Sequence, residues 1–322
     1  MSKEVNVTIL DFLRDKEGHV SGEDIAARLK LSRQALWKHM QELRDLGYEI
    51  AAVPHLGYRL IKIPDRLYPW EVRRGLTTKV LGREVYHHDK VSSTMDLAWD
   101  VGRSENAEGA VVCAEYQSKG RGRQKRHWVS PRSKGLYFSI ILRPDILPSK
   151  IPCITLLSAL AVVYAVKKTT SLSLSIKWPN DILIDNGKLA GILTELNAEQ
   201  DRVNFVVVGI GINVNNKPEE MPEGAVSLRS ALHKKIDRVR LLKGILEEFE
   251  KVYLDFKKNG PATIIDQWRK HSYIWGSKVK VIFPNSELKG EAVDLDPDGA
   301  LLVRRSSGVI EKVIAGDIVT LR

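Results

Sequence analysis

A dense group of cationic side chains lies between Gln117 and Trp128, in the stretch Q-S-K-G-R-G-R-Q-K-R-H-W. Its five cations cannot belong to a hydrophobic core, because burying an unpaired charge is strongly unfavourable. Gly120 and Gly122 carry no Cβ atom, so the backbone beside them can approach a ligand closely. A loop of this kind can bind an anionic group, although a solvated basic loop is the simpler alternative.

Three further segments place polar or charged side chains beside bends and strand ends. Pro179 fixes a bend in Lys177-Trp-Pro-Asn-Asp181, whose charged ends would form an ordinary surface salt bridge in the simpler interpretation. Lys188 opens a predicted strand that contains Gly191, and a glycine inside a strand often marks close approach of a ligand. Gly209-Ile-Gly-Ile-Asn213 ends a strongly apolar strand, but it lacks the third glycine of a dinucleotide-binding fingerprint.

Ser93 and Thr94 stand between a predicted strand at residues 84–87 and a predicted helix from Met95 to Val101. Free backbone amides and hydroxyl groups at a helix N-terminus can hold a polar ligand. Plain N-capping is the alternative, and it is the commoner use of these residue types.

Length and composition bound the class of protein. A chain of 322 residues has room for two or three domains, and 43% hydrophobic with 28% charged residues is typical of a soluble protein. No apolar run approaches the roughly 18 residues of a membrane span, and the polar N-terminus lacks a signal-peptide core, so we expect a cytoplasmic protein. The two cysteines, Cys113 and Cys153, favour buried thiols over a disulfide or a zinc site. The net charge of +10 suits polyanionic partners such as DNA or nucleotides.

Residues 1–63 have the pattern of a winged helix-turn-helix. Ser21 and Ser32 are predicted N-caps of two successive amphipathic helices, and two alternating segments around Pro54-His-Leu-Gly57 predict a hairpin wing. The outward side of the second helix, within the motif Gly22–Gln41, predicts DNA contacts from Ser32, Arg33, Gln34, Lys38 and His39. A protein–protein module of the same shape is the alternative. Spacing leaves open whether Trp37 is a core anchor or an exposed contact.

The rest of the chain predicts two more domains, so the expected fold class is a multidomain α+β protein. Pro64 and Pro69 mark a boundary, and residues 64–270 alternate strands and helices as an α/β domain with a mixed sheet does. Short strands separated by turns predict a small β-barrel of the SH3 kind over residues 271–322.

Four motifs resemble those of biotin protein ligases in order and spacing. They are Q-x-x-G-R-G-R-x-x-R-x-W from Gln117, K-W-P-N-D from Lys177, G-K-L-A-G-I-L from Gly187 and G-I-G-I-N from Gly209. The resemblance covers the whole chain, and the winged helix in front is similar to that of the bifunctional ligases that also repress the biotin operon. It implies a ligase domain related in fold to class II synthetases.

The reaction implied by the resemblance has two steps. Biotin's carboxylate attacks the α-phosphate of ATP, which gives biotinyl-5′-AMP and pyrophosphate, and a lysine amine of a carrier protein then takes the biotinyl group. The first step brings two anions together, so fixed cations and Mg²⁺ must offset their repulsion. No Walker A sequence is present to supply these cations. The adenylate also hydrolyses easily, which calls for a lid that excludes water.

The resemblance also implies residue roles. The implied catalytic residues are Lys188, Arg123 and Asp181, with Asp181 orienting or deprotonating the incoming lysine. The implied biotin contacts are Ser93, Thr94, Met95, Gln117, Gly120, Arg121, Gly122, Arg123, Lys188, Gly191 and Gly209. The implied ATP and adenylate contacts are Arg123, Trp128, Lys177, Asn180, Lys188, Gly211, Asn213 and Arg322. No protein ligand for a metal ion is assigned.

Two positions depart from the family pattern. Met95 stands where the family usually has an asparagine, which removes one polar contact. Lys125 replaces a glycine that commonly follows in the family's loop, which would stiffen the loop or tighten phosphate binding.

The partners implied are a biotin carboxyl carrier protein such as that of acetyl-CoA carboxylase, operator DNA, and a second copy of the chain in a homodimer formed on biotinyl-AMP binding. Association with a membrane is not expected. Two alternatives remain: a biotin-sensing regulator without significant ligase activity, and a ligase for lipoate or octanoate.

Overall fold

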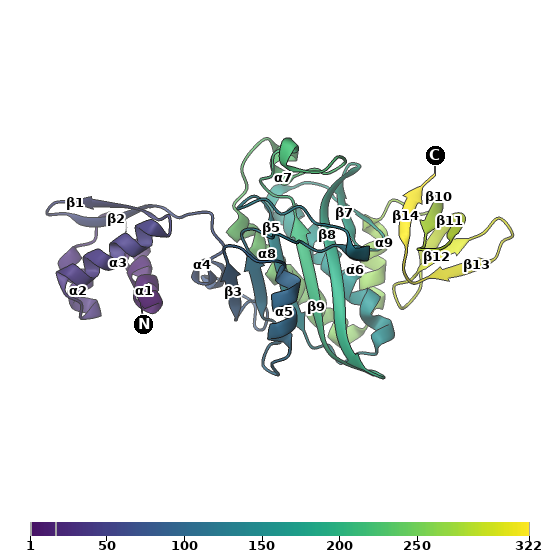
Figure 1. The fold of residues 1–322 in the computed structure, drawn as a ribbon, viewed down its shortest axis with the longest axis horizontal. Helices are drawn as coiled ribbons and strands as arrows, with labels where there is room; N and C mark the ends of the chain where they lie inside the picture. Colours follow the sequence, from purple (N-terminus) through teal and green to yellow (C-terminus); the bar gives the residue numbers. More distant parts are fainter. Residues whose placement is uncertain (1, 17, 322) are drawn as a thin grey trace. The chain divides into compact units, whose positions relative to one another are not determined.

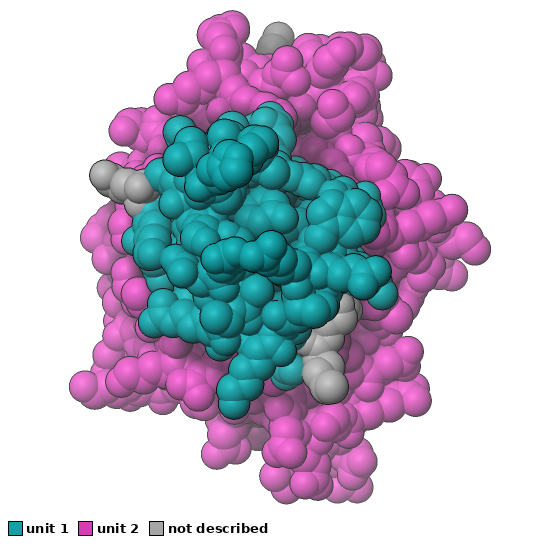
Figure 2. All heavy atoms as spheres, turned by 90° about the vertical axis from the view of Figure 1, so that its left-hand side faces the viewer, with its two compact units in different colours: residues 1–65 teal, residues 66–322 magenta. Residues whose placement is uncertain are grey.

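The computed structural model describes residues 2–16 and 18–321. The chain divides into two compact units, residues 1–65 and residues 66–322, which Figure 2 shows in different colours. The division falls next to Pro64. Residues 271–322, expected as a third domain, belong to the second unit in this division.

The first unit is a helix-turn-helix followed by a two-stranded wing (Figure 1). Its helices are α1 (Ser2–Asp15), α2 (Gly22–Leu29) and α3 (Arg33–Asp45), and its strands are β1 (Glu49–Val53) and β2 (Gly57–Lys62). The Oγ of Ser21 accepts from two amides of the first turn of α2, and the Oγ of Ser32 accepts from the amide of Ala35 at 3.1 Å. Leu36, Met40 and Leu43 are buried, so this part of the fold confirms the sequence prediction.

A seven-stranded sheet forms the centre of the second unit, in the order β3-β4-β5-β9-β8-β7-β6. The strands are β3 (Val85–His88), β4 (Val111–Ala114), β5 (Leu136–Leu142), β6 (Ser175–Lys177), β7 (Asp181–Ile184), β8 (Gly187–Glu199) and β9 (Arg202–Ile212). Only β3 and β4 pair in parallel, so the sheet is mixed, as predicted. The ends of β7, β8 and β9 carry the charged and glycine-containing motifs.

Helices cover both faces of this sheet (Figure 1). They are α4 (Pro69–Arg73), α5 (Thr94–Gly102), α6 (Ile151–Thr170), α7 (Leu228–Leu232), α8 (Arg238–Asn259) and α9 (Ala262–His271). Strand alternation divides the core: Ile140 and Val208 belong to the cluster that contains α6 and α8, whereas Ile141 and Val207 pack in the cluster that contains α5. The N-terminus of α5 therefore lies on the face opposite α6.

The segment Pro148–Thr170, which includes α6, is long and apolar enough to cross a membrane, with a mean hydropathy of 1.8 over its most apolar window. The expectation that no segment meets this requirement is therefore wrong. However, 72% of that window is buried inside the protein, as in the central helix of a folded domain.

The C-terminal residues form a five-stranded antiparallel sheet in the order β13-β12-β11-β10-β14. Its strands are β10 (Lys278–Ile282), β11 (Glu287–Leu295), β12 (Leu301–Arg304), β13 (Ile310–Val313) and β14 (Asp317–Thr320). Among the described residues β13 and β14 do not pair, so the sheet is not the closed barrel that was expected. Turn spacing predicts strands, but closure depends on whether the two end strands meet.

A buried ion pair ties the second unit together. The Oε2 of Glu115, directly after β4, lies 2.9 Å from Nη2 of Arg238 at the start of α8, and both side chains are fully buried. The other oxygen of Glu115 accepts from the amide of Leu67 at 3.0 Å. Burial would raise the pKa of Glu115, but the hydrogen bond to His87 and the charge of Arg238 lower it to about 2.

Replacing Glu115 by glutamine is expected to lower the free energy of unfolding by about 3 kcal/mol at neutral pH, because the buried Arg238 then loses the negative charge of Glu115. The folded-state pKa of Glu115 lies below the ordinary 4.5. Its stabilisation is thus complete above that value and is lost as the pH falls through about 2. Urea unfolding across this range measures the difference. Wild-type and variant curves that lose stability equally on acidification would contradict this account.

Candidate functional site

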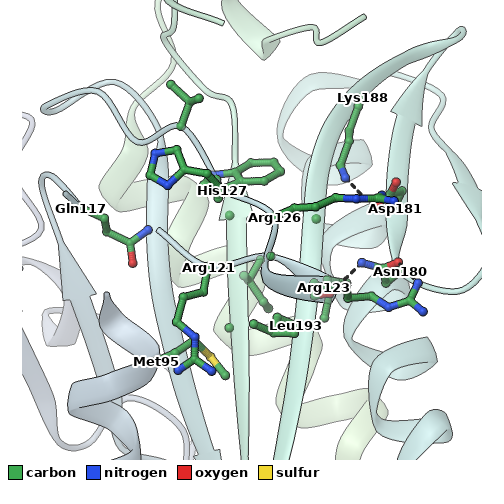
Figure 3. Close-up of a pocket in the computed structure, with 18 of the residues that line it drawn as sticks. Met95, Gln117, Arg121, Arg123, Arg126, His127, Asn180, Asp181, Lys188 and Leu193 are labelled. Carbon is green, nitrogen blue, oxygen red and sulfur yellow. Dashed lines mark hydrogen bonds and ion pairs between the residues drawn. The ribbon is translucent and has the colours of Figure 1, made fainter. Parts of the chain in front are cut away.

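A cavity of about 190 Å³ opens at the ends of β7, β8 and β9, and residues of the basic loop form part of its lining (Figure 3). The predicted residues that line it are Ser93, Thr94, Met95, Gln117, Arg121, Gly122, Arg123, Trp128, Asn180, Asp181, Lys188, Gly191, Gly209, Gly211 and Asn213. The fold thus brings together segments that are separated by more than 100 residues in the sequence.

Three predicted residues are not among those lining the cavity. Gly120 serves the loop itself, because a Cβ atom there would lie 2.4 Å from the carbonyl oxygen of Trp128. Lys177 ends β6 and pairs through its backbone with Asp181, but its side chain does not line the cavity. Arg322 lies outside the described residues.

One end of the cavity is polar and neutral. The Oε1 of Gln117 accepts from the amide and the hydroxyl of Thr94, at 2.8 and 3.2 Å. The Nε2 of Gln117 donates to Ser130, and Ser139 donates to Thr94. Ser93 caps α5 by accepting from the amide of Met95. These buried donors and acceptors can recognise an uncharged polar group such as an amide or a urea.

The side chain of Met95 gives this end an apolar wall. It is 3% exposed and belongs to the α5 core cluster. A Cβ atom on Gly209 would lie 2.4 Å from its sulfur, so Gly209 makes room for Met95. The family's polar contact at this position is therefore replaced by packing.

The other end of the cavity carries the charged groups. The Nζ of Lys188, the second residue of β8, lies 2.8 Å from Oδ1 of Asp181, the first residue of β7. Arg123 donates from Nη1 to Oδ1 of Asn180 at 3.1 Å. Asn180 is held in turn by β8, since its Nδ2 donates to the carbonyl of Ile192. Lys188 and Arg123 therefore both face the cavity, Lys188 beside Asp181 and Arg123 held by Asn180.

The basic loop is an ordered hairpin in this structure. The amide of Trp128 donates to the carbonyl of Gly120, and the amide of Gly122 donates to the carbonyl of Arg126. Between them Gln124 and Lys125 adopt left-handed backbone conformations, with φ of 52° and 59°. Glycine adopts this conformation without penalty, whereas a residue with a side chain loses about 1 kcal/mol. Lys125 therefore adds strain at the loop tip.

Carboxylates hold the loop at both of its ends. Arg121 pairs with Asp96 of α5 at 2.7 Å and also with Glu195 of β8. Burial lowers the pKa of Arg121, but these two carboxylates outweigh burial and raise it. The resemblance implies that Arg121 contacts biotin, and here Arg121 lines the cavity with its charge balanced by these two carboxylates.

At the other end, Asp317 of the C-terminal sheet contacts two arginines of the loop. It pairs with Arg126 and lies 3.6 Å from Arg123, which also donates to the carbonyl of Gly316. Burial is the main influence on Arg123 and lowers its pKa. The C-terminal sheet therefore takes part in the site through Asp317, a residue that the sequence analysis did not single out.

The indole of Trp128 lies on a floor made by two glycines. A Cβ atom on Gly211 would come within 2.5 Å of its ring, and one on Gly191 within 3.0 Å. The Nζ of Lys188 stands 5.6 Å from the ring centroid. The ring nitrogen is buried without a hydrogen-bond partner among the described residues. The glycines of β8 and β9 thus serve to seat this ring.

In the first unit, α3 presents Arg33, Gln34 and Lys38 to solvent, as predicted. His39 is different: its side chain is 14% exposed, and its Nδ1 lies 2.8 Å from Oδ1 of Asn6 on α1. The expectation that His39 points outward is therefore wrong, because packing against α1 decides its direction. Trp37 is the exposed residue instead, with 57% of its surface accessible.

Comparison with known proteins places these features in a family. The chain matches an HTH domain over residues 7–59, the biotin/lipoate A/B protein ligase family over 88–213, and the biotin protein ligase C-terminal domain over 274–320. It is 43% identical, over 93% of both chains, to the bifunctional ligase/repressor BirA of Bacillus subtilis. The chain belongs to the bifunctional biotin ligase/repressor family. It combines a biotin ligase with a DNA-binding repressor.

More distant relatives belong to the same class of protein. The bifunctional ligase/repressor BirA of Escherichia coli is 30% identical, over 98% of this chain and 96% of its own. A solved biotin protein ligase of Aquifex aeolicus, in complex with biotin and ATP, superposes with a TM-score of 0.64 at 28% identity. The superposition covers 74% of this chain and 99% of the Aquifex aeolicus chain.

The charged partners of the loop in this ligase/repressor escaped prediction from the sequence. Asp96, Glu195 and Asp317 carry no motif of their own, and Asp317 lies 191 residues after Arg126. Within the described parts of the chain, no three His, Cys, Asp or Glu side chains are grouped so that they could hold a metal ion.

Proposed function

We propose that the cavity joins biotin to AMP and then transfers the biotinyl group to a lysine of a carrier protein. The observation that carries this proposal is the arrangement of one neutral polar end, around Gln117, and one cationic end, around Lys188 and Arg123. Biotin has a matching polarity, with an uncharged ureido ring at one end and a carboxylate at the other. The ureido group would lie at Thr94 and Gln117, and the apolar chain beside Leu193.

In the first step, a biotin carboxylate oxygen forms a bond to the α-phosphorus of ATP. The bond from that phosphorus to the β-phosphate oxygen breaks, and pyrophosphate leaves. Lys188 and Arg123 would offset the repulsion between the two anions and the charge that develops in the transition state. Asn180 fixes the Arg123 guanidinium in advance, so little reorganisation is required when the substrates arrive.

Mg²⁺ fits this site as a metal brought by the nucleotide. The two carboxylates that line the cavity, Asp181 and Asp317, already face cations, so the protein offers few free oxygen ligands. Mg²⁺ commonly binds through substrate phosphates and water with one or two carboxylates. When bound it would neutralise phosphate charge, and Asp181 is the side chain that we propose could reach it.

In the second step, the carrier's lysine amine attacks the carbonyl carbon of biotinyl-AMP. The bond from that carbon to the phosphate oxygen breaks, AMP leaves, and the amine loses a proton. The Asp181 carboxylate would orient the amine and accept this proton once its contact with Lys188 opens. The adenine would stack on the face of Trp128 that is turned away from the glycine floor, which keeps water from the anhydride.

The test of this proposal is pyrophosphate release from ATP with biotin, lipoate or octanoate as the acid. We expect release with biotin alone, because the polar end matches a ureido group that the other two acids lack. Release with lipoate or octanoate in preference to biotin would favour that ligase class. Absence of release with every acid would leave a biotin-sensing regulator.

Gly211→Ala is expected to lower the rate of biotinyl-AMP formation about tenfold to a hundredfold, because the added methyl group displaces Trp128 from its floor. Pyrophosphate release at saturating biotin measures it. Gly244→Ala is the matched control, since a Cβ atom there meets nothing closer than 3.9 Å. Equal rates for both variants would show that the position of the Trp128 ring has no effect on biotinyl-AMP formation.

We further propose that the protein acts in the cytoplasm on a biotin carboxyl carrier protein, and that biotinyl-AMP favours a homodimer. Two winged helices in one dimer would match a palindromic operator. Sedimentation velocity with and without biotin and ATP tests the dimer. A monomer under both conditions at micromolar concentration would exclude it.

A further inference from the structure

Trp37 is the most exposed aromatic side chain of the described residues, with 57% of its surface accessible. Of the other six tryptophans, Trp178 and Trp268 are buried at 2% and 0%, and the remaining four are half-buried. No ring stacking or cation–π contact involves Trp37 in the described part of the chain. An exposed indole has an apolar ring and a polar N–H group, and such side chains are enriched at interfaces with partner molecules.

Its neighbours on α3 identify the chemistry of that partner. Trp37 stands one helical turn after Arg33 and Gln34 and directly before Lys38, all of which are exposed. Leu36 and Met40 carry the buried face instead. An apolar ring between two cations and an amide suits a polyanion that also presents apolar groups, and DNA has both features.

The charge of Arg33 supports the same conclusion. Its side chain is 81% exposed and pairs with Glu23 of α2, which is 72% exposed. Such a pair between solvated groups contributes little to stability, so a phosphate or a guanine edge can replace Glu23 at small cost. The face around Trp37 is therefore ready to accept a nucleic acid without rearrangement of the helix.

In the major groove of DNA, the C5-methyl group of thymine is the one apolar feature that base edges present. We propose that Trp37 reads thymine, with the methyl group packed against the indole while Arg33 and Lys38 contact phosphates or guanine. This inference rests on the repressor function, and it assigns a residue that selects the sequence. Each subunit of a dimer would read one such thymine in each half of a palindrome.

The experiment uses the full-length protein with biotin, ATP and Mg²⁺. A DNA duplex is first selected by this protein from a random-sequence library. Each thymine of the duplex is then replaced by deoxyuridine, which removes the methyl group and leaves the hydrogen-bonding edge unchanged. Fluorescence anisotropy measures the dissociation constant of each duplex for wild type, Trp37→Ala, Trp37→Phe and Leu254→Ala.

For wild type we expect deoxyuridine at one position of each half-site to weaken binding about three- to tenfold, the value of one buried methyl group. Trp37→Ala should bind the thymine duplex more weakly and should bind both duplexes equally. Trp37→Phe should keep part of the discrimination. Leu254→Ala, which removes an exposed apolar side chain of the second unit, should match wild type.

Thymine discrimination that persists in Trp37→Ala would overturn the proposal, provided that thermal unfolding shows the variant to be folded. The proposal would also be overturned if Trp37→Ala bound the selected duplex as tightly as wild type. It would be overturned as well if the weaker binding of Trp37→Ala were due to a loss of dimer formation. If wild type enriches no sequence from the library, operator binding and the proposal both fail. Enrichment without Trp37-dependent discrimination overturns the thymine contact alone.

Discussion

Replacing Lys188 by alanine is expected to lower the rate of biotinyl-AMP formation about a hundred- to a thousandfold. The Nζ of Lys188 faces the cavity beside Asp181 and above the Trp128 ring, where the carboxylate and the α-phosphate would meet. Losing this charge leaves the repulsion of the two anions without one of its fixed counter-ions. Pyrophosphate release with saturating biotin and ATP measures the effect.

Lys258→Ala is the matched control for this variant, because Lys258 is an exposed lysine at the end of α8. It should retain the wild-type rate. Asp181→Asn should slow transfer of the biotinyl group to the carrier more than it slows pyrophosphate release, because only the second step needs this carboxylate as a proton acceptor. An unimpaired rate in Lys188→Ala would remove the basis for the assigned chemistry.

The second large effect is expected in the first unit. Replacing Arg33 and Lys38 together by alanine should weaken operator binding about a hundredfold or more at low salt, since both side chains are exposed on α3. If each contacts one phosphate, the slope of log K against log salt should fall by about 2. Anisotropy titrations at several salt concentrations give both quantities.

A variant with the same change in net charge provides the control. Lys234 and Lys235 are exposed cations of the second unit, and their double replacement should leave the salt slope unchanged. Ligation by the Arg33/Lys38 variant should also stay at the wild-type rate, because the cavity lies wholly in the second unit. An equal loss of DNA binding in both double variants would indicate a general charge effect instead of a binding face.

Local signals allowed much of the fold to be predicted from the sequence. The hydroxyl groups of Ser21 and Ser32 cap the helices that their spacing predicts. The motifs at Lys177, Gly187 and Gly209 lie at neighbouring strand ends, because β7, β8 and β9 are adjacent in the sheet. In these cases the information is contained in a few consecutive residues.

Features that depend on distant contacts could not be predicted. The direction of His39 depends on Asn6 in another helix, and the partner of Arg126 is in the last strand of the chain. The resemblance implies that Gly209 contacts biotin and that Gly211 contacts the nucleotide, yet the side chains of Met95 and Trp128 lie directly against these two glycines. No local pattern encodes which side chain from elsewhere will lie against a bare backbone.

The loop shows how these two kinds of information combine. Its cations and glycines are evident in the sequence, but its closed form depends on carboxylates from α5, β8 and β14. The strain at Lys125 opposes that closure. A lid held by solvated ion pairs at both ends can open for exchange of substrate and product while the sheet below stays fixed.

The most direct test of the central claim is the mass of a carrier domain after incubation with the protein, biotin, ATP and Mg²⁺. The account predicts that the carrier gains one biotinyl group on a lysine, and that it gains none with Lys188→Ala over the same time. A carrier that remains unmodified with the wild-type protein, while a known biotin ligase modifies it, would contradict the account.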